Sequence, residues 1–262
     1  TAQVLAKQGL LKELDHAKIP NLGNLGAPFR EVSYDPGQKW SVPYIWGTTG
    51  FAYNEDCVKT PPTSWKALWD PQYEGRIYML DNMLAAYIAG LQVNGFKAGS
   101  TTPAEIEKAT QSLIDQKKVL GGYNSTNFGD LVASGEACIV QGWNGSIAQV
   151  MATNPKVKYV VPDEGGSMWI DGFAIPSSAK NVEEAYKFID YIMRPDVAAK
   201  AANLSKSATV IDKAKELLPK DVVDNAAIYP AEDKLMKADF ILDVGDATKL
   251  YQDGWTKVKT AQ

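Results

Sequence analysis

The sequence has 262 residues, with 27 Lys and Arg against 31 Asp and Glu, so its formal net charge is −4. This charge argues against nucleic acid as the main partner, because binding to phosphates requires a basic face. No apolar run approaches the roughly 18 residues of a membrane span, and one His and two Cys are too few for a zinc site of the His/Cys type. The composition indicates one large or two medium folded domains.

Helices and strands are predicted to alternate along the chain. A first helix is expected over 2–15, where apolar residues recur at helical spacing. Extended segments follow at 39–45 and 51–54, separated by the glycine-containing segment Gly47–Gly50. The segment 82–93 is apolar on nearly every face, which predicts a buried helix. Further helices are expected at 63–69, 102–116, 128–134 and 182–193, strands at 76–80, 137–142, 156–161 and 167–175, and a mainly helical segment up to 259. This alternation predicts a layered α/β protein with a mostly parallel sheet.

The sequence contains no recognisable catalytic motif. His16, the only histidine, stands in a polar stretch and is expected to be an exposed surface residue. No nucleophile–histidine pattern and no glycine-rich phosphate or dinucleotide loop is present. Asp81 ends a buried strand, a position where carboxylates act in α/β folds, but no partner acid, base or metal motif accompanies it. We therefore predict no catalytic residue, no metal site and no cofactor.

Two interpretations remain open for Cys57 and Cys138, the only thiols. In an exported protein they would form a disulfide. The loop that it closes would be worth about 4–5 kcal/mol in the chain-entropy model. The alternative is two separate buried thiols.

The segment Met168–Pro176 is predicted to be a strand with a carboxylate, Asp171, in its middle. An acid in an apolar strand is costly unless it is paired or hydrated, and no basic residue is near it in the sequence. Trp169 lies two positions away and therefore shares a face with Asp171. An aromatic plate beside a carboxylate can receive an ammonium group through cation–π attraction and charge-assisted hydrogen bonds. The alternative is that Asp171 pairs with a distant lysine or caps a loop.

A second candidate is Trp143, which stands where a buried strand turns into a helix that begins at Asn144. Ligands of open α/β sheets commonly bind at the carboxyl ends of strands, next to helix N-termini. The alternative is a core tryptophan that closes the sheet.

Several short motifs occur in a fixed order along the chain: Pro43-Tyr44-Ile45-Trp46-Gly47, Thr63-Ser64-Trp65, Trp143-Asn144-Gly145-Ser146, Glu164-Gly165-Gly166, Trp169-Ile170-Asp171, Arg194-Pro195-Asp196-Val197, Ile228-Tyr229-Pro230 and Asp243-Val244-Gly245. Each motif is weak alone. Their order and spacing together closely resemble the spermidine/putrescine-binding proteins of bacterial ABC importers, and the resemblance covers the chain from Thr1 to Lys259.

The resemblance implies a type II periplasmic binding protein, in which two α/β lobes close on a ligand about hinge strands. Lobe one would comprise 1–46 and 171–215, and lobe two 51–166 and 219–262. Gly47, Gly50 and Gly172 would then be hinge residues. Members of the family carry a further N-terminal segment before the position of Thr1, so the first lobe is expected to be N-terminally truncated.

The same resemblance implies an amine site made of aromatic residues and carboxylates. Trp143, Trp169 and Asp171 match positions of that site. In the family the matching acid grips an ammonium group, and the two aromatic residues stack on the alkyl chain.

Other matched positions depart from the family. Asn82 and Ala85 stand where polyamine binders carry carboxylates, Ser207 stands near a tyrosine position, and Ile241 near a glutamine position. An unpaired, desolvated ammonium group costs several kcal/mol. We therefore expect a smaller ligand with one strong ammonium anchor, such as putrescine, and count Asn82 and Ser207 among the candidate ligand-binding residues.

The resemblance predicts a monomeric, non-enzymatic periplasmic protein that delivers a small amine to an ABC transporter permease in the inner membrane and binds no nucleic acid. The alternatives are a receptor for an amino acid such as γ-aminobutyrate or for another amine, and a sensor subunit. An enzyme on the same fold is disfavoured, because no nucleophile, base or cofactor site is visible.

Overall fold

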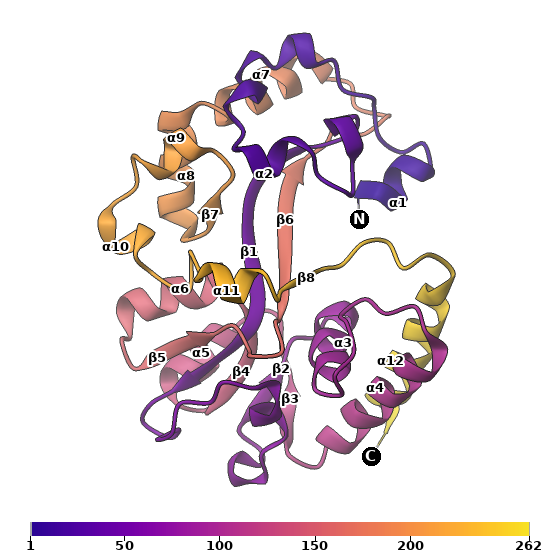
Figure 1. Cartoon of the computed structure of the whole chain (residues 1–262), viewed down its shortest axis with the longest axis vertical. Helices are drawn as coiled ribbons and strands as arrows, with labels where there is room; N and C mark the ends of the chain where they lie inside the picture. Colours follow the sequence, from indigo (N-terminus) through magenta and orange to yellow (C-terminus); the bar gives the residue numbers. More distant parts are fainter. Residues whose placement is uncertain (1, 262) are drawn as a thin grey trace. The chain divides into compact units, whose positions relative to one another are not determined.

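The computed structural model describes residues 2–261 and divides the chain into two compact units (Figure 1). Two long strands, β1 (Val42–Asn54) and β6 (Ser167–Phe173), contribute residues to both units. No helix among the described residues is both long enough and apolar enough to cross a lipid bilayer. Unit 1 comprises Thr1–Gly47 and Ile170–Asn225, and unit 2 comprises Thr48–Trp169 and Ala226–Gln262.

The strands of unit 2 form a mixed sheet in the order β3-β2-β4-β1-β6-β8, and β5 also pairs with β1. The sequence predicted a mostly parallel sheet. Instead, β1 runs antiparallel to β4 and β5, whereas β2 runs parallel to both β3 and β4. The shorter strands are β2 (Ile77–Met79), β3 (Leu120–Tyr123), β4 (Ile139–Trp143), β5 (Val157–Val160) and β8 (Asp239–Phe240).

The predicted interruption at Gly47–Gly50 is wrong, because β1 runs through these residues as one strand of 13 residues. Gly50 permits a close approach between strands: a Cβ there would lie 2.2 Å from the carbonyl oxygen of Val160 in β5. Gly172 has the same role in β6, where a Cβ would lie 2.6 Å from the carbonyl oxygen of Val42. Both glycines are therefore explained by backbone packing rather than by a break in the strand.

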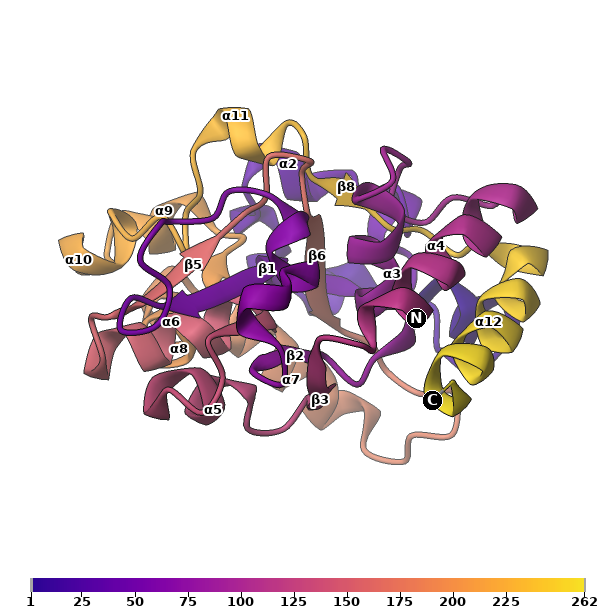
Figure 2. The same cartoon turned by 90° about the horizontal axis from the view of Figure 1, so that it is seen from below.

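Helices cover both faces of the unit 2 sheet (Figure 2). Side chains alternate along a strand, so Phe51 and Met79 join the core on one face, whereas Ala52 and Val140 join the core on the other. The first face is covered by α3 (Met83–Gln92), α4 (Pro103–Gln116) and α12 (Thr248–Thr260), and the second by α5 (Phe128–Ser134) and α6 (Asn144–Thr153). The other helices of unit 2 are α11 (Glu232–Leu235) and the 3-10 turns Trp65–Trp69, Pro71–Tyr73 and Gly245–Ala247.

The first helix of unit 1 is shorter than predicted. Helix α1 covers only Ala2–Lys7, and Gly9 then adopts a φ of 69°, which ends the helical path. Leu11 forms an isolated antiparallel bridge with Pro176, and both Leu11 and Leu14 are buried. Two of the apolar residues that suggested a longer helix, Leu11 and Leu14, are thus buried from a segment that is not helical.

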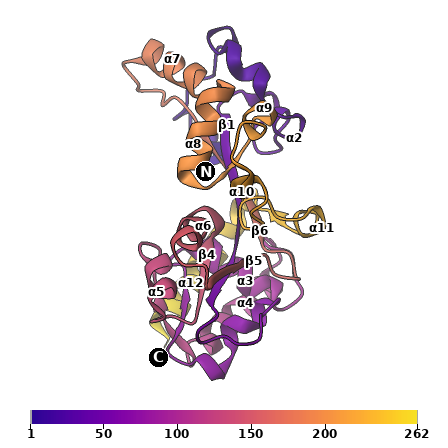
Figure 3. The ribbon, with the colours of Figure 1, turned by 90° about the vertical axis from the view of Figure 1, so that its left-hand side faces the viewer.

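The remainder of unit 1 is mainly helical, and α8 packs against both α7 and α9 (Figure 3). Ala198, Ala199 and Ala202 of α8 are buried, so small side chains allow its neighbours to approach closely. The elements are α2 (Ala27–Arg30), α7 (Val182–Ile192), α8 (Pro195–Ser205), β7 (Ala208–Thr209), α9 (Asp212–Lys215), α10 (Lys220–Val223) and the 3-10 turns His16–Lys18, Pro20–Asn24 and Pro36–Gln38.

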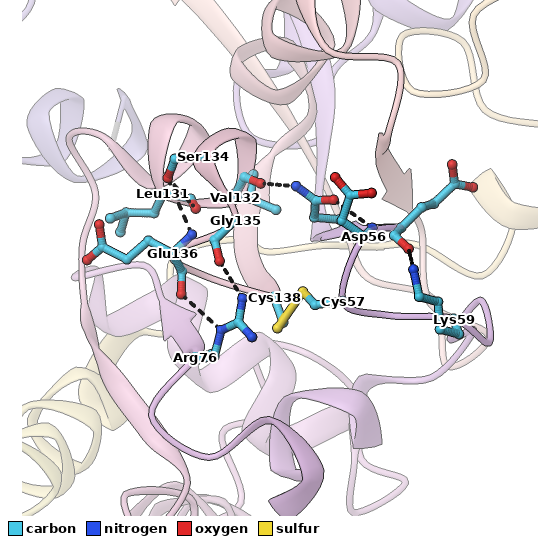
Figure 4. Close-up of a disulfide and its surroundings, with 12 residues drawn as sticks. Asp56, Cys57, Lys59, Arg76, Leu131, Val132, Ser134, Gly135, Glu136 and Cys138 are labelled. Carbon is cyan, nitrogen blue, oxygen red and sulfur yellow. Dashed lines mark hydrogen bonds between the residues drawn. A yellow bond between two sulfur atoms is a disulfide. The ribbon is translucent and has the colours of Figure 1, made fainter.

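Cys57 and Cys138 form a disulfide, with their Cα atoms 5.8 Å apart (Figure 4). The bond joins the segment after β1 to the residue before β4. The amide of Cys138 also donates to the carbonyl of Arg76 at 2.8 Å. The sequence left open a disulfide or two separate thiols, and the structure contains the disulfide.

Candidate functional site

Trp143 lies at the carboxyl end of β4, half-buried, and packs edge-to-face on Phe128 with the ring centroids 5.8 Å apart. The next residue, Asn144, is buried and anchors this corner of unit 2. Its Oδ1 accepts from the amide of Thr48 at 2.9 Å, and its Nδ2 donates to the carbonyl of Ala227 at 2.8 Å. Three segments of unit 2 therefore fix the backbone that presents Trp143 at the carboxyl edge of the sheet.

Asn82 lies at the same edge of unit 2, where it caps α3. Its Oδ1 accepts a hydrogen bond from the amide of Ala85 at 3.0 Å, and Ala85 itself is buried. The amide side chain of Asn82 is thus used to satisfy the helix N-terminus. Neither residue brings a negative charge to the edge.

Trp169 lies on β6 within unit 2 and is half-buried. Its indole Nε1 is buried and has no hydrogen-bond partner among residues 2–261. Most buried donors in proteins are paired, so an orphaned indole N–H indicates a donor that is available to a ligand or to water. Trp169 and Asp171 are two positions apart, and the alternation of β6 places them on one face of that strand.

Asp171 belongs to unit 1 and is exposed, with no lysine or arginine paired to it in the part of the chain that the structure describes. Partial burial raises the pKa of the Asp171 carboxyl above its ordinary value. Burial also raises the pKa of Tyr34 to about 12, and the nearby carboxylates of Asp35 and Asp171 add to that shift. Tyr34 is therefore a neighbour of Asp171 that the sequence analysis missed, because it lies in an irregular segment outside any motif.

Ser207, also in unit 1, is buried between α8 and β7. Its hydroxyl donates to the carbonyl of Ser205 at 3.4 Å, and its amide to the carbonyl of Ala202 at 3.3 Å. In unit 2, Ile241 is half-buried against the core that α3, α4 and α12 share. His16 is exposed, as predicted, with Nε2 2.8 Å from the carbonyl oxygen of Gln38.

Asp81, the weak candidate at the end of β2, has an ion-pair partner that the sequence did not indicate. The Nζ of Lys259 lies 2.8 Å from its Oδ1. Lys259 also lies over the rings of Tyr123 and Trp255, at 4.5 and 5.5 Å from their centroids. Unit 2 therefore gathers Trp143, Asn82 and Asp81 at its carboxyl edge, and unit 1 gathers Asp171 and Tyr34.

Two known proteins align with nearly the whole chain. The spermidine/putrescine-binding periplasmic protein 1 of Haemophilus influenzae is 34% identical over 259 residues, which cover 98% of this chain and 72% of that protein. The spermidine/putrescine-binding periplasmic protein of Salmonella typhimurium is 32% identical, with coverage of 98% and 74%.

A solved structure shows the same architecture. The spermidine/putrescine ABC transporter substrate-binding protein of Streptococcus pneumoniae superposes with a TM-score of 0.87 at 29% identity, covering 99% of this chain and 81% of that one. This similarity confirms the predicted α/β fold of a type II binding protein. The family model of the bacterial extracellular solute-binding proteins matches residues 1–231. The chain belongs to the family of bacterial extracellular solute-binding proteins.

Proposed function

We propose that the protein is the substrate-binding component of a bacterial ABC importer and that it binds a small cationic amine in the periplasm. The names of the spermidine/putrescine-binding relatives support this function. Binding and release require no chemical step, so the protein acts as a receptor rather than as an enzyme. The ligand-bound protein is the form that an inner-membrane permease recognises.

The observation that carries the proposal is the carboxylate of Asp171 in unit 1, two positions along β6 from Trp169 in unit 2. No lysine or arginine among residues 2–261 neutralises this carboxylate, and its pKa is raised by burial. An ammonium group would supply the missing positive charge through charge-assisted hydrogen bonds. Trp169 would add cation–π attraction of about 0.5–2 kcal/mol, and Trp143 offers a second aromatic surface for an alkyl chain.

The surroundings favour a short ligand over a long polyamine. Asn82 is neutral and is used as a helix cap, and Ala85 is buried and apolar. Asp81 is already paired with Lys259. A second or third ammonium group of a long polyamine would therefore lack a partner, which is costly in a desolvated site. Putrescine carries one such further ammonium group and spermidine carries two, so putrescine fits this set of residues better.

One observation favours a second candidate, an ω-amino acid such as γ-aminobutyrate. The buried Nε1 of Trp169 is a donor without a partner among the described residues. An ammonium group cannot accept a hydrogen bond, whereas a carboxylate can. A ligand with both groups would satisfy Asp171 and Trp169 at once.

Isothermal titration calorimetry with putrescine, spermidine, γ-aminobutyrate and n-butylammonium tests both candidates. We expect saturable binding of putrescine, with spermidine bound more weakly. Tighter binding of γ-aminobutyrate than of putrescine would favour the second candidate. If none of the four ligands binds, the proposed amine receptor is wrong.

Asp171→Asn tests the residue that carries the proposal. Removal of a charge partner of a bound cation costs 2 kcal/mol or more, so we expect at least a roughly 30-fold weaker affinity for putrescine. Asp221→Asn is the matched control, because Asp221 is an exposed acid on α10 of the same unit. It should leave the affinity within about twofold. Equal losses in both variants would show that only the net charge matters.

A further inference from the structure

The ammonium group of Lys259 sits in a box of one carboxylate and two aromatic rings in unit 2. Its Nζ is 2.8 Å from Oδ1 of Asp81, 4.5 Å from the ring centroid of Tyr123 and 5.5 Å from that of Trp255. The two rings meet edge-to-face with centroids 5.1 Å apart. We call Asp81, Tyr123 and Trp255 the ammonium box.

Three elements bring the box together. Asp81 follows β2, Tyr123 ends β3, and Trp255 lies on α12, one helical turn before Lys259. Because β2 and β3 are parallel neighbours, their carboxyl ends meet at one edge of the sheet. Residues four apart share a helix face, so α12 contributes both an aromatic wall and the cation that it surrounds.

The box and Trp143 lie at the same edge of the unit 2 sheet. In the parallel ladder of β2 and β4, Ile77 is level with Ile139 and Tyr78 with Val140. Asp81 follows β2 and Trp143 ends β4, so both lie at the carboxyl ends of neighbouring parallel strands.

The chemistry of the box is that of an amine receptor. Aromatic faces attract cations, and a carboxylate adds a charge-assisted hydrogen bond. The hydroxyl of Tyr123 is buried with no hydrogen-bond partner within the described residues, so this wall makes no competing polar contact there. The side chains of Lys259 and Asp81 keep 37% and 49% of their surface exposed. An exposed ion pair of this kind is weak enough to be exchanged.

We propose that the ammonium box is a binding site for a primary alkylammonium group, and that the side chain of Lys259 from the same chain occupies it. A tethered lysine acts at a millimolar or higher effective concentration and excludes weakly bound free amines. Removal of the Lys259 ammonium opens the site to a small external amine. This site is independent of Asp171 and of the proposed function, because it needs only the residues of unit 2.

Nuclear magnetic resonance titration with ethylammonium chloride, against sodium chloride at equal ionic strength, tests the site. The readout is the indole N–H signal of Trp255, assigned with Trp255→Phe. In Lys259→Met we expect a saturable shift with a dissociation constant at least tenfold lower than in the wild-type protein. A titration of Lys259→Met without a saturable shift, or one identical to that of the wild type, would overturn the proposal.

Three further variants control the measurement. Lys259→Gln removes the same charge with a polar side chain and should behave like Lys259→Met, which guards against misfolding of a single variant. Lys259→Met combined with Asp81→Asn should lose the response, and a retained dissociation constant would contradict the role of Asp81. Lys249→Met removes a lysine of the same helix that pairs with Asp253, and it should titrate like the wild-type protein.

Discussion

Asp171, the carboxylate proposed to bind the ligand, is expected to destabilise the ligand-free protein. The side chain of Asp171 is exposed overall, but partial desolvation of its carboxyl raises the pKa, so the folded state binds this proton more tightly than the unfolded state does. The stabilising contribution is then present at low pH and is lost as the pH rises through the raised pKa. At neutral pH the ionised carboxylate is a cost that a bound cation would relieve.

The first prediction follows from the direction of this pKa shift. At pH 7, Asp171→Asn should unfold at a higher urea concentration than the ligand-free wild-type protein, because the variant has no charge to desolvate. The difference should shrink near about pH 3, where an ordinary aspartic acid is protonated. The same variant is expected to bind putrescine more weakly, so stability and affinity should change in opposite directions. A lower urea midpoint at pH 7 would mean that Asp171 is a structural residue.

Helices of this protein pack closely at a position where a glycine provides no side chain. Gly254 of α12 lies against α3 and α4, where a Cβ would be 2.2 Å from Oη of Tyr87 and 2.6 Å from Oγ1 of Thr110. Those two hydroxyl groups form a buried hydrogen bond with each other. The glycine therefore allows α12 to pack closely without breaking that pair.

The second prediction concerns this contact. Gly254→Ala should lower the free energy of unfolding by about 1–3 kcal/mol, because a methyl group cannot enter without displacing Tyr87 or Thr110. Urea unfolding followed by circular dichroism measures the change. Gly23→Ala is the control, since a Cβ at Gly23 would meet no atom within 4 Å. Equal stability of the two variants would contradict the packing argument.

Elements were predictable where the local pattern matched the final environment. The segment 82–93 is apolar on all faces, and α3 is buried from Ala85 to Gln92. The pattern failed where contacts from elsewhere decided the conformation. The glycines of β1 suggested a break, yet Gly50 allows β5 to approach closely. The first helix ends before Gly9, and Leu11 then pairs with the distant Pro176.

On the scale of the whole molecule, the disulfide closes a covalent loop within unit 2. Cys57 and Cys138 are 81 positions apart in the sequence, and the bond ties the end of β1 to the start of β4. In the chain-entropy model a crosslink of this span stabilises by restricting the unfolded chain, by about 4–5 kcal/mol.

The third prediction tests that contribution. Reduction of the disulfide should lower the free energy of unfolding by up to about 4–5 kcal/mol, measured by guanidinium unfolding with and without reductant. The double variant Cys57→Ala and Cys138→Ala should be destabilised similarly and should no longer respond to reductant. A protein whose unfolding is insensitive to reductant would show that the bond does not constrain the unfolded state.

The sequence by itself determined the α/β alternation, the family and the identity of Trp143, Trp169 and Asp171 as candidates. These features are local: periodicity within a segment, motifs in a fixed order, and a carboxylate two positions from a tryptophan on one strand. Contacts between distant residues were decided only by the tertiary structure. Lys259 and Asp81 are separated by 178 positions, and the proximity of Tyr34 to Asp171 and the pairing of the two cysteines are likewise long-range. No periodicity or motif records such contacts, because they arise only when the sheet brings separate strand ends and helices to one place.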